Sequence, residues 1–257
     1  MTLTAPHIPV PDGESGIDPR AVCPVRVPRP WMLHRWDQLT FLHWRYDPGV
    51  VQQLLPPGLT VETFDGSAWV GLVPFVMQVR PPGVGPAPWL SNFPETNVRT
   101  YATGPDGSTG VWFLSLDASR LAAVLGGRLG YRMPYFWSRM RVRRVDDSIA
   151  YDCDRRWPRP TPAASRIEVR IGERFADEEL DDLDHWLTAR WSLFSYRPSA
   201  ISIAHAEHPP WELHRAEAVR CDDRLVRASG LPAPQGEPLV HHSPGTAVRI
   251  SRPYRLR

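Results

Sequence analysis

The sequence predicts an α+β protein, mostly β, built as an antiparallel sheet that curls, or closes into a β-cone or barrel, with a few helices outside it. Two observations support this fold class. From Trp31 onward, short apolar runs with alternating polar residues recur between Pro and Gly, as in strands joined by turns. Only three segments keep helical spacing. A closed barrel of this size can hold one small ligand.

Two parts of different composition divide the chain. Residues 1–30 are rich in Pro, Gly and charge and have no sustained period of a helix or a strand, which predicts an extended arm or a disordered tail. Residues 31–257 contain no internal repeat and no clear linker, so we expect a single domain there. A chain of 257 residues, of which 42% are hydrophobic, can form a substantial core.

Three helices are expected from caps and apolar spacing. Asp47 followed by Pro48 predicts a helix start, and the next proline ends that segment. Asp117 is expected to cap a second helix that runs toward Arg128, and Asp177, followed by two glutamates, begins a third. The apolar residues at helical spacing are Val50, Val51, Leu54 and Leu55, then Leu121, Val124 and Leu125, then Leu180, Leu183, Leu187 and Trp191.

Strands are expected where β-branched or aromatic residues alternate with polar ones. The Asp-Gly pairs at 65–66 and 106–107 and the Asp-Asp pair at 146–147 predict turns between such runs. The predicted strands are residues 68–79, 97–102, 110–116, 138–145, 149–153 and 165–171.

Composition excludes several classes of protein. The net charge is +2, with arginines and acids interspersed, so no basic stripe points to nucleic acid as a partner. No apolar run reaches the length of a membrane-spanning helix, and no signal segment is evident, so we expect a soluble cytoplasmic protein and no membrane partner. Three distant cysteines without a C-x-x-C pair argue against a disulfide framework and a cysteine-based zinc site.

The chain has no lysine: all 30 of its Lys and Arg side chains are arginine. An imine with a ketone requires a primary amine that can lose its proton, and a guanidinium cannot supply one. The dinucleotide motif G-x-G-x-x-G, the P-loop and the serine hydrolase motif G-x-S-x-G are also absent. We therefore expect no nucleotide cofactor, and no cofactor of another kind is indicated.

The segment from Gly127 to Trp137, GRLGYRMPYFW, resembles the signature G-R-E-x-x-G-x-P-K-K of acetoacetate decarboxylases. In that family the first lysine of the closing pair condenses with a ketone, but Tyr135 and Phe136 stand at the two lysine positions here. The segment 93–99, FPETNVR, is similar to the strand that supplies an active-site carboxylate in the family, which points to Glu95. The resemblance covers most of the chain after residue 30 and implies a familiar fold without its imine chemistry.

A fuller set of motifs resembles an uncharacterised branch of that superfamily, filed as a domain of unknown function. The branch has an aromatic residue at the lysine position, so the loss is a trait of the branch. The matching segments are F-x-HW at 41–44, LLP at 54–56, NVRTY at 97–101, SLDA at 115–118, MPY at 133–135 and HPPW at 208–211.

Tyr135 and Glu95 are the catalytic candidates that the resemblance implies. A phenol at position 135 could donate a hydrogen bond to a carbonyl or enolate oxygen, or it could be a buried tyrosine with a satisfied hydroxyl. Glu95 could act as a general base, or as an acid with a raised pKa in a dry cavity.

Asn97, Arg99 and Tyr101 alternate with Glu95 along one strand, so their side chains share a face. If that face points inward, it forms a binding wall, and if it points outward, it is ordinary surface. The resemblance favours the inward direction. Arg99 would then hold a substrate carboxylate or neutralise Glu95.

Arg128 and His43 complete the predicted substrate-binding residues, each with a structural alternative. Arg128 could reach an anion or tie a helix to a strand, and His43, between Leu42 and Trp44, could equally be a satisfied core histidine. Two imidazoles and a carboxylate in HAEH at 205–208 do not have the spacing of a helical zinc motif, so no metal site is predicted. The roles of the histidines at 205, 208, 241 and 242 stay open.

Two functions fit these residues. The first is a lyase-type or cyclase-type enzyme acting on a carbonyl-containing metabolite, β-keto or polyketide-like, by acid-base catalysis without an imine, as in cyclisation, dehydration or decarboxylation. The second is a non-catalytic protein that binds a small hydrophobic ligand. A carboxylate and a phenol that converge in one buried place would favour catalysis. The arm could contact a partner, and a homo-oligomer is an open expectation, since oligomers are common among relatives.

Overall fold

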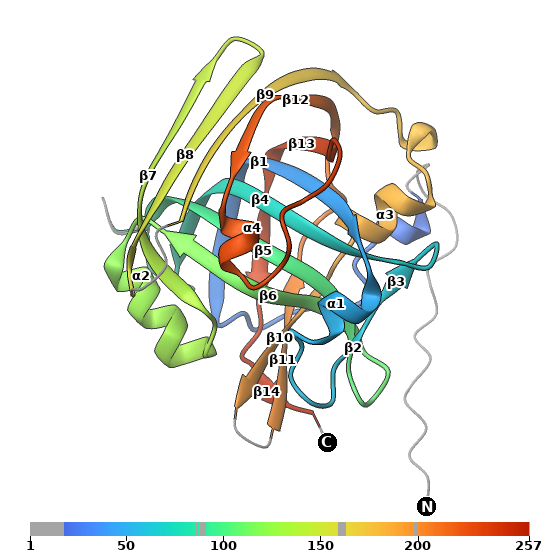
Figure 1. Cartoon of the computed structure of the whole chain (residues 1–257). Helices are drawn as coiled ribbons and strands as arrows, with labels where there is room; N and C mark the ends of the chain where they lie inside the picture. The colour runs from blue at the N-terminus through green and yellow to red at the C-terminus, as the bar shows by residue number, and fades with distance from the viewer. Residues whose placement is uncertain (1–17, 86, 88–90, 159–162, 198–199, 257) are drawn as a thin grey trace, which may run out of the picture.

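The computed structural model describes residues 18–85, 87, 91–158, 163–197 and 200–256 (Figure 1). Its strands, in chain order, are β1 (Met32–Tyr46), β2 (Thr60–Val61), β3 (Thr63–Phe64), β4 (Ser67–Arg80), β5 (Asn92–Thr103), β6 (Thr109–Ala118), β7 (Tyr135–Val145), β8 (Ser148–Trp157), β9 (Ala164–Arg174), β10 (Ser192–Arg197), β11 (Ala200–Glu207), β12 (His214–Asp223), β13 (Leu239–Ile250) and β14 (Tyr254–Arg255).

The helical segments are short and lie among the strands. They are a 3-10 turn (Pro19–Ala21), α1 (Pro48–Gln52), α2 (Leu121–Gly126), a π-helix (Gly127–Tyr131), a second 3-10 turn (Asp177–Glu179), α3 (Asp182–Thr188) and α4 (Leu225–Ala228). In Figure 1, α2 lies at the left of the molecule and α3 at the right, while α4 lies in front of the central strands. The expected mostly-β fold class is confirmed.

One 14-stranded sheet contains all the strands and curls back on itself. Its order is β14-β11-β10-β6-β7-β8-β9-β12-β13-β1-β4-β5-β2. Because β5 also pairs with β6, the strands from β6 round to β5 form a closed ring. Most pairings are antiparallel, as expected from the many short connections. The sheet is nevertheless mixed, because β6 runs parallel to both β7 and β10.

The six predicted strands are confirmed as β4 to β9, each a few residues longer than its alternating pattern. The longest strand, β1, was not among them. Its pairing with β4 shifts between Asp37 and Leu42, and Gln38 has a positive φ of 50°, which marks a bulge. A bulge changes which residues face each side, so the alternation that identifies a strand is interrupted there.

Helix prediction was right for one segment and wrong in detail for two. The Asp47 carboxylate accepts hydrogen bonds from the backbone of Gly49 and Val50 and caps α1, as expected. Asp117, however, lies in β6 and caps no helix, and α2 begins only at Leu121. The predicted third helix is a 3-10 turn followed by α3, because Asp181 starts a new helix with a capping box.

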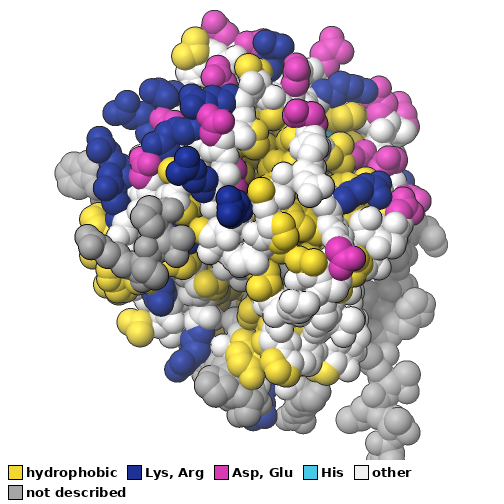
Figure 2. Space-filling model, in the orientation of Figure 1, with side chains coloured by type: hydrophobic (Ala, Val, Ile, Leu, Met, Phe, Trp, Pro, Cys, Tyr) yellow, Lys and Arg dark blue, Asp and Glu magenta, His cyan; other side chains and the backbone are white. Residues whose placement is uncertain are grey.

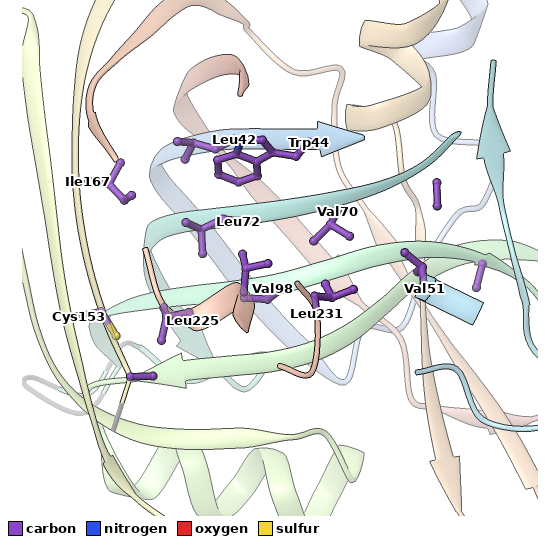
Figure 3. Close-up of a cluster of buried hydrophobic side chains, with 14 of the residues drawn as sticks. Leu42, Trp44, Val51, Val70, Leu72, Val98, Cys153, Ile167, Leu225 and Leu231 are labelled. Carbon is purple, nitrogen blue, oxygen red and sulfur yellow. The ribbon is translucent and has the colours of Figure 1, made fainter. Parts of the chain in front are cut away.

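The main hydrophobic core lies on one face of the central strands. Figure 3 shows Leu42, Leu72 and Val98, from β1, β4 and β5, gathered around Leu225 of α4. These four side chains have no exposed area. Because alternate residues of a strand face opposite sides, the odd-numbered residues of β5 turn away from this core.

The surface mixes charges of both signs. In Figure 2, Arg side chains gather at the upper left, where β7 and β8 lie in Figure 1, with acids among them. Arg143 pairs with Asp152 and Arg166 pairs with Asp154 in this region. Within the described residues, no helix is both long and apolar enough to cross a membrane.

Most of the predicted arm, residues 1–17, lies outside the described residues. Its last part runs over β11 and β13. The backbone N–H of Val27 donates to a carboxylate oxygen of Glu207 at 2.6 Å, and Arg249 donates from Nε to the Val27 carbonyl at 2.9 Å. Residues 18–30 thus make specific contacts with the sheet.

Candidate active site

A buried polar wall follows β5. Glu95, Asn97, Arg99 and Tyr101 alternate along the strand and face the side opposite to the core of Figure 3. Glu95, Asn97 and Tyr101 are at most 6% exposed, and Arg99 is half-buried. The face therefore points into the protein, as the resemblance implied.

Glu95 and Tyr135 meet at one end of this wall. The Tyr135 hydroxyl donates a hydrogen bond to Oε2 of Glu95 at 3.2 Å. Burial raises the pKa of the Glu95 carboxyl to about 8, although this hydrogen bond acts in the other direction. Burial, together with the neighbouring Glu95, also raises the pKa of Tyr135 well above its ordinary value. The phenol therefore keeps its proton, and the carboxyl changes charge near neutral pH.

The crossover between β6 and β7 positions the phenol. Tyr135 is the first residue of β7 and lies opposite Leu116 of β6, which in turn pairs with Asn97. The Tyr135 ring covers Gly127, where an added Cβ would collide with it. Arg128 donates from Nη1 to the Tyr135 carbonyl at 2.5 Å and so ties the helical segment to the strand. This contact corresponds to the structural alternative for Arg128.

A second polar group lies at the other end of the wall. The Tyr101 hydroxyl donates to the Leu187 carbonyl of α3 at 2.7 Å, and His43 Nε2 lies 2.7 Å from the same hydroxyl. Gly71 of β4 separates His43 from Arg99, and a Cβ there would come within 2.9 Å of His43 Nε2. Glycine is required at position 71, because the His43 ring and the Arg99 side chain occupy the space that a side chain would take.

Several buried polar atoms on the wall have no hydrogen-bond partner among the described residues. They are His43 Nδ1, Asn97 Oδ1 and Arg99 Nε. Two further unpartnered atoms are Ser119 Oγ, next in sequence to the Glu95 sheet partner Ala118, and Tyr131 Oη, near Tyr135. Buried polar atoms in proteins nearly always have partners, so a group of unpartnered ones on a single face is typical of a place that receives a polar ligand or water. Sequence reasoning missed Ser119 and Tyr131 because neither follows a pattern.

His241 and Asp184 form a further pair that sequence reasoning missed. His241 Nε2 lies 2.9 Å from Oδ1 of Asp184, and both residues are buried. His241 pairs with Phe41 in the sheet and faces the side of His43, whereas His242 faces the other side and reaches Thr40. Strand alternation separates the two histidines, so a predicted strand there could have revealed the division.

Asp117 belongs to a different site on the core side of the sheet. Its two carboxylate oxygens accept from Arg155 Nε at 2.9 Å and Nη2 at 2.6 Å, and Ser138 donates to it at 2.7 Å. Both side chains of the ion pair are almost fully buried. Asp117 is thus a structural ion-pair partner rather than a helix cap.

The remaining candidates stand apart from the wall. His205 lies beside Ser192 and Tyr254, and His208 packs between Trp191 and Trp211. No cluster of three or more possible ligands for a metal ion occurs among the residues that the structure describes.

The three cysteines, Cys23, Cys153 and Cys221, are free thiols. A hollow of about 290 Å³ lies near Tyr196 and Ile201, away from Glu95, and its lining is mostly proline and aliphatic side chains. The candidate catalytic and binding residues lie on the polar wall of β5 and do not line this hollow.

Solved structures with this fold are acetoacetate decarboxylase-like. An acetoacetate decarboxylase from Legionella pneumophila has a TM-score of 0.63 at 12% identity, with 97% of this chain and 98% of that chain covered. An acetoacetate decarboxylase-like enzyme from Sphingomonas wittichii RW1 has a TM-score of 0.60 at 15% identity, covering 88% and 92%. The enduracididine biosynthesis enzyme MppR, complexed with pyruvate, has a TM-score of 0.61 at 14% identity, covering 90% and 92%. The fold is therefore that of acetoacetate decarboxylase.

Within this fold the family is also established. Residues 34–247 match the DUF2071 family, described as an uncharacterized conserved protein. The uncharacterized protein YqjF of Bacillus subtilis (strain 168) is 33% identical over 216 residues, which cover 83% of this chain and 88% of YqjF. The chain belongs to the DUF2071 family, as the motifs of the uncharacterised branch predicted.

Proposed function

We propose that this protein is an enzyme that moves a proton at the carbon beside a carbonyl group of a small metabolite, β-keto or polyketide-like, without forming an imine. The observation that carries the proposal is the buried contact between Glu95 and Tyr135. A carboxyl group with a pKa of about 8 can give or take a proton at neutral pH, which is the property a general acid-base catalyst needs. An all-apolar cavity would have favoured the binding-protein alternative.

In the proposed reaction the substrate carbonyl oxygen takes over the hydrogen bond that Tyr135 donates to Glu95. The Glu95 carboxylate then removes a proton from the adjacent carbon, and the electron pair of that C–H bond moves to form an enolate. Tyr135 stabilises the enolate oxygen as a fixed donor. Return of the proton to carbon completes an exchange, whereas loss of a leaving group or attack on a second carbonyl would give dehydration or cyclisation.

The test follows exchange of hydrogen for deuterium next to the carbonyl, by NMR in deuterated water, over a panel of oxo acids and polyketide-like diketones. Tyr135→Phe should slow exchange by about 10² to 10³-fold, because an oxyanion donor is lost. Glu95→Gln should slow it by about 10² to 10⁴-fold, because the acid-base group is lost. The wild-type rate should rise with pH and level off above about 8, as the Glu95 carboxyl ionises.

Two controls make the result specific. Tyr46→Phe removes a phenol whose hydroxyl donates to the Pro232 carbonyl, away from Glu95, and should leave exchange unchanged. Borohydride treatment with an oxo acid should give no reduced adduct within the chain, because the sequence has no lysine. Exchange that survives both Tyr135→Phe and Glu95→Gln would show that the assignment is wrong.

A further inference from the structure

Arg99 has a guanidinium edge that no carboxylate occupies. Its Nε has no partner among the described residues, and its Nη2 reaches two neutral oxygens, the Tyr101 hydroxyl at 3.4 Å and the Leu187 carbonyl at 3.3 Å. Arg155 provides the contrast, because its Nε and Nη2 bind both oxygens of Asp117. The edge that binds a carboxylate in Arg155 therefore has only neutral partners in Arg99, and its Nε has none among the described residues.

A purely structural role explains Arg99 poorly. Arginine can cap the C-terminus of a helix, and Leu187 lies in the last turn of α3. The Leu187 carbonyl, however, already accepts a shorter hydrogen bond from Tyr101, at 2.7 Å. A neutral side chain would suffice for packing against Phe41, over whose ring the guanidinium lies. Keeping a half-buried charge without an anion is costly, so a ligand anion is the natural partner.

The charges around Arg99 define the kind of anion. Arg190, nearby, is already paired with Glu62 at 2.7 Å. Burial and the adjacent Arg99 lower the pKa of His43 well below its ordinary value, so His43 is neutral. Because the Tyr101 hydroxyl donates its hydrogen bond to the Leu187 carbonyl, it accepts the one from His43, whose Nε2 must be the donor. Among Arg99, His43 and the Arg190–Glu62 pair, one positive charge is left, which suits a carboxylate bound as a fork better than a doubly charged phosphate.

The spacing along β5 sets how far this anion lies from the reacting carbon. Glu95 and Arg99 are four residues apart, which corresponds to roughly 13 Å between their Cα atoms in an extended strand. The guanidinium reaches Tyr101 and Leu187 and also lies over the Phe41 ring. A β-keto acid, with its carbonyl carbon two bonds from the carboxyl carbon, is much shorter than this separation. Asn97 lies between them with a free Oδ1, where it could accept a hydrogen bond from the middle of a longer substrate.

We propose that Arg99 binds the carboxylate of a long oxo acid, whose distal carbonyl reacts at Glu95 and Tyr135. This inference rests on the proposed function for the position of the reacting carbon, but the anion site itself does not. It names the substrate class as a chain with a carboxylate at one end and a carbonyl several bonds away.

The test compares the binding of three probes, 3-oxobutanoate, 7-oxooctanoate and the methyl ester of 7-oxooctanoate, by titration calorimetry. The wild type should bind 7-oxooctanoate about 10 to 100-fold more tightly than its ester, as expected for a charge-assisted hydrogen bond. It should bind the shorter acid more weakly. Arg99→Gln should remove the preference for acid over ester. Arg45→Gln should keep the preference for acid over ester, because Arg45 is an exposed arginine of β1 that lies over the Trp69 ring.

The outcomes separate the two proposals. Equal binding of acid and ester by the wild type, no binding of either acid, or a preference that survives Arg99→Gln in a folded variant would overturn the anion site. Equal binding of the short and long acids would overturn the spacing. Glu95→Gln should retain the preference for acid, since Glu95 lies at the other end of the wall. If the preference depends on Arg99 while exchange does not depend on Glu95, the anion site stands and the proposed function fails.

Discussion

Two sets of an acid and an arginine lie on opposite faces of one sheet, on different strands, and they differ in their pairing. Asp117 and Arg155 touch through both oxygens and two nitrogens and are almost fully buried. Glu95 and Arg99, on the other face of neighbouring strands, point to separate ends of the wall, and Glu95 meets a phenol instead. Asp117 and Arg155 bind each other within the chain, whereas Glu95 and Arg99 do not form an ion pair with each other. The two sets thus differ in whether the acid and the arginine pair with each other.

The largest effect on this comparison should come from Asp117→Ala. It leaves Arg155 buried without its partner, and the free energy of unfolding should fall by about 3–5 kcal/mol in a urea titration. Asp152→Ala removes a carboxylate from the exposed pair with Arg143 and should cost no more than about 1 kcal/mol. Equal losses in the two variants would mean that burial does not set the value of these ion pairs.

Glu95→Gln should change how stability depends on pH. The carboxyl binds its proton more tightly in the folded protein, with a pKa of about 8 against an ordinary 4.5. The wild type therefore loses stability as pH rises between these two values, by at most about 5 kcal/mol, and this loss is absent at lower pH. The glutamine variant lacks that loss, so it should be the more stable protein at pH 9.

The control for this experiment has the opposite sign. Hydrogen bonds from Arg215 and from the Ala176 backbone lower the pKa of Glu179, which is exposed. The ionised Glu179 carboxylate stabilises the folded protein at neutral pH, and this stabilisation is lost as the pH falls and the group is protonated. Glu179→Gln should therefore lower the free energy of unfolding at neutral and higher pH, and have little effect at low pH. If the difference in unfolding free energy between the wild type and Glu95→Gln stays constant from pH 4.5 to pH 9, the Glu95 carboxyl is not desolvated.

A smaller effect is expected from Gly127→Ala, which tests how the phenol is placed. The new Cβ would collide with the Tyr135 ring, so stability should fall by about 1–3 kcal/mol and proton exchange should slow as in Tyr135→Phe. Gly130→Ala in the same π-helix meets nothing within 4 Å and serves as the matched control. Similar exchange rates in the two variants would argue that the ring position does not matter.

Much of the fold could be predicted because its signals are local. Alternation identified β4 to β9, and a cap followed by proline identified α1. The same alternation predicted that Glu95, Asn97, Arg99 and Tyr101 share a face, which is observed. That face is buried, although polar residues alone would have suggested a surface. The motif comparison, not the pattern of hydrophobicity, supplied that direction.

The errors arise where partners are distant in sequence. Asp117, four residues before an apolar helical pattern, has the local appearance of a helix cap, but its partner Arg155 is 38 residues away. His241 and Asp184 are likewise joined only by the folded chain. In β1 the bulge at Gln38 interrupts the alternation of apolar and polar residues, so the sequence pattern does not predict a strand there. Local patterns cannot report contacts that only the closure of the sheet creates.

The π-helix before β7 has a consequence for which side chain faces Glu95. A π-turn contains one residue more than an α-turn, and such insertions often occur at functional sites. Removing a single residue from this crossover would shift β7 by one position, so that Phe136 takes the place of Tyr135 and Trp137 takes the place of Phe136. A phenyl ring would then meet the carboxyl group of Glu95, and the indole of Trp137 would take the place of Phe136 over Arg155. The phase of one helical turn thus determines whether this family member presents a hydroxyl group or a hydrocarbon ring at its centre.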